Sequence, residues 1–291
     1  MIPPEILKQV RRIEITTNRI VNDTMAGRYE SVFKGQGIEF EEVREYQPGD
    51  EVRAIDWNVT ARTGRPHIKR FVEERELTVM VLVDLSRSMA FGSASQLKQR
   101  IATEICAVLA FSAIKNHDKI GLLLFTDRVE RFVPPKKGTT HVLRVIREAL
   151  SYEPAGRGTD VSGALAYLSR VMRRKSVAFL ISDFHCRDIG PALAIANRRH
   201  DVIGVHLIDP REESLPPIGW LQLEDAESGE QALVDAGDAS VREAYARATA
   251  AQRLRVVKTL RTAGVDCIEV RTDESYVRPL LKFFRARSLR R

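Results

Sequence analysis

Four unbroken apolar runs, separated by stretches with helical spacing, limit most strongly what this chain can fold into. The runs are LTVMVLVDL, KIGLLLFT, SVAFLISDF and DVIGVHLID. Strands that are apolar on both faces are typical of a parallel sheet covered by helices on both sides. We therefore predict a doubly wound α/β domain over residues 77–291, with a mostly parallel sheet flanked by helices. After the fourth run we expect an edge hairpin in GWLQLEDAESGEQALVDAG, a long polar helix over 239–263, a last strand in VDCIEV and a terminal helix.

Two shorter segments precede this domain. Residues 1–34 have the apolar spacing of a helix and are predicted to be an N-terminal helical segment. Residues 35–76 contain the short runs IEFEEVREY, VRAIDWNVTAR and PHIKRFVEE between PGD and TGRP turns, which predicts a small antiparallel β module. Its charged residues are expected to pair with one another and to hold the module on the main domain; they include Glu42, Arg44, Asp50, Arg53, Asp56 and Arg62.

Composition excludes several classes of protein. The hydrophobic share of 44% and the charged share of 29% are those of an ordinary globular protein. No apolar stretch approaches the roughly 20 residues of a membrane-spanning helix, and the amino terminus lacks the pattern of a signal peptide. The three cysteines are far apart and form no CxxC pair. We expect a cytoplasmic protein with reduced thiols and no transmembrane segment.

Polar residues that could carry chemistry gather where strands end. One group follows VMVLV, a second lies in the loop GRGTD before a predicted helix, and a third follows VAFLI. Ligands of open α/β sheets bind outside the carboxyl ends of the strands, so these groups are expected to meet at one edge. The candidate site consists of Asp84, Ser86, Ser88, Thr159 and Asp183.

This set offers two carboxylates and three hydroxyls, with no sulfur or imidazole. Oxygen donors favour a hard cation, which we expect to be Mg²⁺, with Mn²⁺ or Ca²⁺ as alternatives. Five such ligands leave the ion incompletely coordinated and, for Mg²⁺, still holding water, so a carboxylate from a partner would complete its coordination. The pattern therefore predicts a metal-dependent binding site for an acidic residue of another protein. We predict no catalytic residues, no organic cofactor and no enzymatic activity.

The DxSxS pattern, with a loop threonine and a strand-end aspartate, resembles the metal-ion-dependent adhesion site (MIDAS) of von Willebrand factor A domains. All five positions match. The resemblance implies that the hydroxyls of Ser86 and Ser88 ligate the ion directly. It also implies that Thr159 and the carboxylates of Asp84 and Asp183 bind the ion directly or through water.

The upstream segment GQGIEFEEVREYQPGDEVRAIDWNVTARTGRPHIKRFVEERE, leading into VLVDLSRSMAFG, resembles the bacterial family called domain of unknown function 58. This likeness covers nearly the whole chain from Gly35. It implies a partnership with a MoxR-type AAA+ ATPase and a chaperone-like role in the assembly or maturation of other proteins. The client would be an unidentified protein that offers an acidic residue.

Two other functions are weighed against this one. Asp84 could be the nucleophile of a phosphatase-like hydrolase, but such enzymes place a second acid two residues later, where this chain has Ser86. The net charge of +7 and the basic end RPLLKFFRARSLRR could favour a membrane surface or nucleic acid. Only the Phe283-Phe284 pair adds aromatic rings there, so we do not expect nucleic-acid binding, and peripheral membrane contact stays open.

Three residues next to the candidate ligands have less defined roles. His185 and Cys186 follow Asp183, but adjacent residues of an extended segment point to opposite sides, so we interpret both as spectators. Arg87 lies inside the first loop and either meets the acidic group of a partner or faces solvent.

Overall fold

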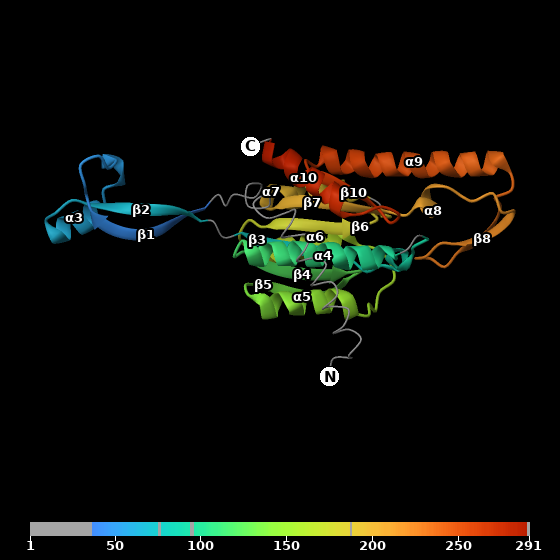
Figure 1. The fold of residues 1–291 in the computed structure, drawn as a ribbon, viewed down its shortest axis with the longest axis horizontal. Helices are drawn as coiled ribbons and strands as arrows, with labels where there is room; N and C mark the ends of the chain where they lie inside the picture. The colour runs from blue at the N-terminus through green and yellow to red at the C-terminus, as the bar shows by residue number, and fades with distance from the viewer. Residues whose placement is uncertain (1–36, 75–76, 94–95, 187, 290–291) are drawn as a thin grey trace. The chain divides into compact units, whose positions relative to one another are not determined.

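The computed structural model describes residues 37–74, 77–93, 96–186 and 188–289 (Figure 1). These residues form two compact units, a small one that ends at Leu77 and a large one that begins at Thr78. The helix predicted within residues 1–34 lies outside the described residues. Each unit is described below by itself.

The small unit is an antiparallel strand pair with a helical connection. Strand β1 (Gly37–Glu45) pairs with β2 (His67–Glu74). Between them lie the 3-10 helix η2 (Val52–Ala54) and the helix α3 (Trp57–Thr63). The predicted antiparallel strand pair is confirmed, but the run VRAIDWNVTAR is helical and the prediction of a strand there is wrong.

Asp56 explains why this run becomes a helix. Its carboxylate accepts hydrogen bonds from the backbone N–H groups of Asn58 (3.0 Å) and Val59 (3.3 Å), which caps the first turn of α3. The same side chain forms an ion pair with Lys69 of β2 at 3.1 Å. Arg44 and Asp50 form a second pair within the unit, at 2.7 Å. Of the charged residues named from the sequence, Arg44 and Asp50 therefore pair with each other, and Asp56 pairs with Lys69.

The large unit is built on a six-stranded sheet. Its order is β10-β7-β6-β3-β4-β5, and all neighbours run parallel except the antiparallel pair of β4 and β5. The apolar runs of the sequence lie at its centre, where every residue of β6 is buried. The strands are β3 (Thr78–Asp84), β4 (Lys119–Phe125), β5 (Val129–Lys136), β6 (Val177–Ser182), β7 (Asp201–Ile208) and β10 (Asp266–Arg271).

Helices cover both faces of this sheet. A core of Met80, Leu82, Ala178 and Leu180 packs against α6, α7 and α9 on one face. Phe179 alternates with two of these residues, so it points to the other face, where it contacts a ring of α10. The helices are α4 (Lys98–Lys115), α5 (Thr139–Ser151), α6 (Val161–Val171), α7 (Gly190–Arg199), α9 (Ala239–Thr262) and α10 (Val277–Leu289). The predicted doubly wound architecture is confirmed.

A hairpin of β8 (Trp220–Glu224) and β9 (Gln231–Asp235) forms a separate two-stranded sheet. The sequence predicts it at an edge of the main sheet, and this placement is wrong, because β10 occupies the edge beside β7. Figure 1 shows β8 at the same end of the unit as α8 (Pro210–Glu213), a short helix that the sequence analysis does not predict.

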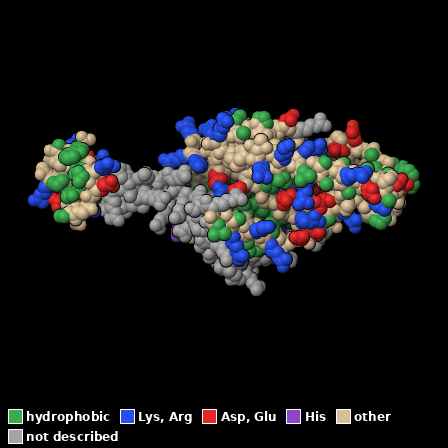
Figure 2. Space-filling view, turned by 90° about the horizontal axis from the view of Figure 1, so that it is seen from above, with side chains coloured by type: hydrophobic (Ala, Val, Ile, Leu, Met, Phe, Trp, Pro, Cys, Tyr) green, Lys and Arg blue, Asp and Glu red, His purple; other side chains and the backbone are tan. Residues whose placement is uncertain are grey.

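The basic end of the chain contributes to the core. Phe284 of α10 is fully buried. Arg287 pairs with Asp201 and, at 3.2 Å, with Asp266. On the face that Figure 2 shows, acidic and basic side chains of the large unit are interspersed. None of the helices that the structure describes combines the length and the apolar character needed to cross a membrane.

Candidate metal centre

The first loop of the candidate site is organised by Asp84, the last residue of β3. This carboxylate is fully buried. One oxygen accepts a hydrogen bond from the backbone N–H of Ser86 (2.8 Å), and the other accepts one from the hydroxyl of Ser182 (2.6 Å). Asp84 is therefore fixed by the loop that follows its own strand and by the last residue of the neighbouring β6.

The hydroxyls of Ser86 and Ser88 lie 3.1 Å apart, and both side chains are buried. The 3-10 helix η3 (Arg87–Ala90) places them on one side of the loop. Ser86 precedes this helix but makes no side-chain capping hydrogen bond. The hydroxyl of Ser86 therefore contacts Ser88 within the loop and does not cap the helix.

Asp183 follows β6, the strand that pairs with β3, so the two aspartates stand at adjacent strand ends. Burial raises the pKa of Asp84, and the negative charge of Asp183 raises it further. Two neighbouring buried carboxylates repel each other, and a cation between them would remove that repulsion.

Phe184 turns the chain sharply after Asp183. Its φ of 55° lies in the left-handed region, which a bulky side chain rarely adopts. The ring is buried and packs edge-on against His206, with centroids 5.6 Å apart. The backbone N–H of Phe184 donates to the hydroxyl of Ser182 (2.9 Å). This turn is held by the core and connects to Asp84 through one serine.

The sharp turn also brings His185 back to Asp183. The Nδ1 atom of His185 lies 3.3 Å from Asp183 Oδ2. The sequence analysis interprets His185 as a spectator, and the structure gives it a direct contact with Asp183, one of the candidate ligands.

Lys98 of α4 is a buried cation that the sequence analysis missed. Its ammonium group lies 2.7 Å from Asp183 Oδ2 and 2.5 Å from Glu212 Oε1, and the side chain has no exposed surface. Burial lowers the pKa of Lys98, but the two carboxylates outweigh burial and raise it. For Asp183, burial raises the pKa, while His185 and Lys98 outweigh burial and lower it. Asp183 is thus a charged carboxylate with one oxygen already paired.

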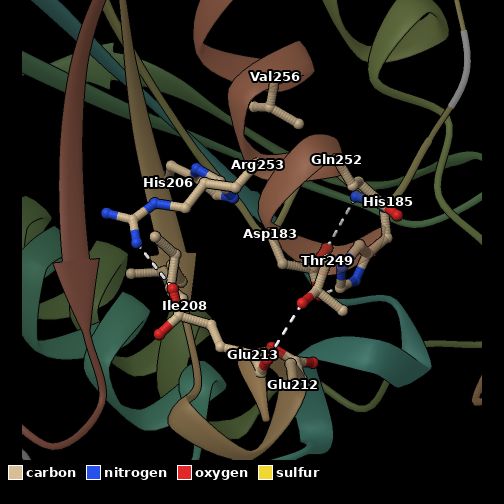
Figure 3. A pocket seen from close by; sticks show the side chains of 11 residues that line it. Asp183, His185, His206, Ile208, Glu212, Glu213, Thr249, Gln252, Arg253 and Val256 are labelled. Atoms are coloured by element: carbon tan, nitrogen blue, oxygen red, sulfur yellow. Dashed lines mark hydrogen bonds and ion pairs between the residues drawn. The ribbon is translucent and has the colours of Figure 1, made fainter. Parts of the chain in front are cut away.

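Glu212 reaches Lys98 because α8 has a capping box. The Asp209 side chain accepts a hydrogen bond from the N–H of Arg211 (2.9 Å), and Glu212 accepts one from the N–H of Asp209 (3.3 Å). Figure 3 shows Asp183, His185 and Glu212 around a cavity. Their ligand atoms lie within 4.8 Å of one another, as in groups that hold a metal. The ammonium group of Lys98 forms ion pairs with two of these residues, Asp183 and Glu212.

Thr159 belongs to the second loop, which the structure joins to the first. The backbone N–H of Arg87 donates to the carbonyl of Arg157 (2.9 Å). The hydroxyl of Thr159 donates to Glu227 of the β8–β9 hairpin (2.5 Å). Thr159 therefore has an acidic hydrogen-bond partner, Glu227, that the sequence analysis does not predict.

The residues fit a hard divalent cation. Asp84, Ser86 and Ser88 present buried oxygens within one loop, and Asp183 adds a negative charge beside them. Oxygen ligands of this kind suit Mg²⁺, Mn²⁺ or Ca²⁺. Such an ion would polarise a bound carboxylate or water and hold it at the edge of the sheet.

Residues 42–255 match the family described as "Protein of unknown function DUF58". The chain belongs to this family. An uncharacterized protein of Mycobacterium tuberculosis, Rv1480, is 34% identical over 288 residues, covering 98% of this chain and 90% of that protein. The magnesium-chelatase 67 kDa subunit of Heliobacterium mobile is 31% identical over 99 residues, covering 34% of this chain and 14% of that subunit.

Solved structures also resemble the chain. An aerotolerance-related membrane protein of Bacteroides fragilis aligns with a TM-score of 0.51 at 15% identity, covering 74% of this chain and all of that chain (100%). The SpRpn10 VWA domain aligns with a TM-score of 0.39 at 11% identity, covering 71% of this chain and 94% of that chain. The first likeness shows the fold alone, and it agrees with the helix-covered parallel sheet described above.

Proposed function

We propose that this member of the DUF58 family is a metal-dependent protein-interaction module that acts by binding and not by catalysis. The observation that carries the proposal is the buried cluster at the ends of β3 and β6, where Asp84 and Asp183 stand beside two serine hydroxyls. Metal dependence follows from the chemistry of these donors. The ligands would be Asp84, Ser86, Ser88, Thr159 and Asp183, with Mg²⁺ as the ion.

The charges of the cluster explain why it would bind an acidic partner. Two carboxylates could neutralise one divalent ion, but Asp183 already pairs with Lys98 and His185. The ion would therefore keep net positive charge. A carboxylate from a partner protein would supply the missing negative charge and a further oxygen ligand. The proposed module thus recognises an acidic side chain through its bound cation.

The proposed partner is a MoxR-type AAA+ ATPase, and the proposed role is chaperone-like assembly or maturation of other proteins. Support comes from the resemblance of residues 35–76 and of the DxSxS loop to the family. The likeness to a magnesium-chelatase subunit, a component of a larger assembly by its name, agrees with a role among several chains.

The two alternatives are less well supported by the geometry. For a phosphatase, Asp84 would have to attack substrate, but it is fully buried and both oxygens accept hydrogen bonds. For a basic membrane-surface or nucleic-acid binder, α10 would have to expose its aromatic residues, but Phe284 is fully buried. Its Arg287 forms ion pairs within the unit.

Metal binding is tested first, by isothermal titration of Mg²⁺ into the purified chain. We expect the double variant Ser86→Ala with Ser88→Ala to lose at least about tenfold in affinity, since ligand changes are at least as costly as changes in their supporting residues. Ser112→Ala is the matched control, because it is equally buried and its hydroxyl donates only within α4 (2.8 Å to the Val108 carbonyl). Equal affinities of the three proteins would contradict the proposed metal site.

Partner binding is tested with a purified MoxR-type ATPase encoded beside a family member. We expect co-purification in Mg²⁺ that is lost in EDTA and in the double serine variant, and kept in Ser112→Ala. Complexes that form equally well in all four conditions would refute metal-dependent binding. Sustained hydrolysis of phosphate esters that disappears in Asp84→Ala would refute the non-enzymatic proposal.

A further inference from the structure

The β8–β9 hairpin holds Glu227 in a well-defined turn. The carboxylate of Asp225 accepts hydrogen bonds from the N–H groups of Glu227 (3.1 Å) and Ser228 (2.7 Å). The turn is closed by two backbone bonds of 2.8 Å, from Asp225 N–H to the Glu230 carbonyl and from Gly229 N–H to the Asp225 carbonyl. Gly229 takes a φ of 75°, which favours glycine. Glu227 is thus held at the tip of an ordered turn.

The side chain of Glu227 is directed at the candidate metal centre. Its Oε1 accepts the hydrogen bond from Thr159, a residue 68 positions away in the sequence. The negative charge of Glu227 also acts on Cys186, together with the charges of the two aspartates. Burial, then Asp84, Asp183 and Glu227, raise the pKa of Cys186 to about 12. The carboxylate of the hairpin therefore lies on the same side of the sheet as the candidate ligands.

A second contact ties the hairpin to the first loop. Arg87 lies 3.8 Å from Glu224, and both side chains are about half exposed. An ion pair of this kind contributes little and weakens with salt. The hairpin itself is largely exposed, with 66% of Trp220 and 68% of Leu233 accessible. The hairpin is therefore positioned over the centre by few and weak contacts.

A carboxylate beside two other carboxylates is unfavourable without positive charge, and one hydroxyl compensates only part of this cost. A divalent ion at Asp84, Ser86 and Ser88 would make the interaction attractive, because a hard cation binds a further carboxylate oxygen favourably. Glu227 offers that oxygen from within the chain.

We propose that Glu227 is an internal carboxylate ligand of the metal centre. The β8–β9 hairpin then covers the centre until an acidic residue of a partner takes the place of Glu227. This inference rests on the proposed function, and it assigns the hairpin the role of a competitor that sets how strongly a partner must bind. The Arg87–Glu224 ion pair adds only a weak second contact, so the hairpin can be displaced.

The test uses Mn²⁺ as the probe, with Glu227→Gln compared with Glu230→Gln. Glu230 is an exposed acid of the same turn whose backbone carbonyl, and not its side chain, accepts the bond from Asp225. We expect Mn²⁺ affinity to fall about tenfold in Glu227→Gln and to stay unchanged in Glu230→Gln. Water-proton relaxation should show more exchangeable water on Mn²⁺ bound to Glu227→Gln, because one ligand position is vacated. Acetate should displace that water in Glu227→Gln at lower concentration than in the unchanged protein.

The outcomes separate this inference from the function on which it depends. If the Ser86→Ala, Ser88→Ala variant loses Mn²⁺ while Glu227→Gln binds with unchanged affinity and hydration, the metal site stands and the internal ligand is refuted. If the unchanged protein binds no Mn²⁺, both proposals fail. Thermal unfolding of each variant checks that it is folded.

Discussion

Replacing Lys98 by methionine should destabilise the large unit strongly, because it removes the only buried ammonium that the structure shows between Asp183 and Glu212. Methionine fills a similar volume, so the change is mainly one of charge. Removing one partner of a buried ion pair costs about 3–5 kcal/mol. Glu212 keeps 24% of its side chain exposed and can turn to water, whereas Asp183 keeps 1%. The destabilisation therefore comes mainly from the unpaired carboxylate of Asp183, and we expect the free energy of unfolding to fall by about 3 kcal/mol.

The measurement is urea unfolding followed by circular dichroism at pH 7, with Lys258→Met as the control. Lys258 is an exposed lysine of α9, so its replacement should change the free energy of unfolding by less than about 0.5 kcal/mol. In a domain of this size a loss of about 3 kcal/mol lowers Tm by roughly 6–12 °C. A loss below about 1 kcal/mol for Lys98→Met would refute the assignment of Lys98 as the buried counter-ion.

The pH dependence of the unfolding free energy provides a second check on the role of Lys98. Because Lys98 and His185 lower the pKa of Asp183, this carboxylate stabilises the fold above its ordinary pKa of 3.8, and the stabilisation is lost as the pH falls further. The Lys98→Met variant lacks the part of this stabilisation that Lys98 supplies. The difference in unfolding free energy between the two proteins should therefore be full at pH 7 and should narrow below about pH 4. If the difference in unfolding free energy became larger in acid, the ion pair between Lys98 and Asp183 could not be its source.

Three further predictions concern other parts of the large unit. Gly121→Ala should cost about 1–3 kcal/mol in urea unfolding, because a Cβ atom would lie 2.5 Å from Met80 Sδ and 2.9 Å from the Val133 carbonyl, whereas Gly190→Ala, with its nearest atom at 3.5 Å, should cost much less. Iodoacetamide at pH 8 should leave all three cysteines largely unmodified in the folded chain by mass spectrometry, since burial raises each thiol pKa to about 12, and urea should expose them. Mg²⁺ affinity measured by titration should begin to fall at a pH well above 3.8, because the raised pKa of Asp84 lets protons compete with the ion.

The sheet and the first loop could be predicted from the sequence because their signals are local. An unbroken apolar run such as VAFLI reports burial on both faces, and a polar residue directly after it, such as Asp183, must lie at the end of that strand. The same logic placed Ser86 and Ser88 beside Asp84, where the structure also has them. Helix α3 was missed because a capping aspartate inside an alternating run looks like a polar strand residue.

Lys98 and Glu227 could not be predicted in the same way, since each meets its partner only through the tertiary fold. Lys98 and Glu212 are 114 positions apart, and Thr159 and Glu227 are 68 apart. One signal was present for Lys98. It lies on the helical face of Ile101 and Ile105, both buried, so a charged residue in that stripe indicates a buried partner.

The left-handed backbone at Phe184 makes the candidate centre a sensor of the packing around it. A bulky residue keeps a φ of 55° only while its ring is locked in the core, at a cost of about 1–3 kcal/mol. If that packing were lost, Phe184 would be free to relax toward the ordinary region, and Asp183 before it would move relative to Asp84. We then expect the affinity of the proposed site for its ion to fall before the sheet unfolds. Binding through the proposed site would thus depend on an intact core around Phe184.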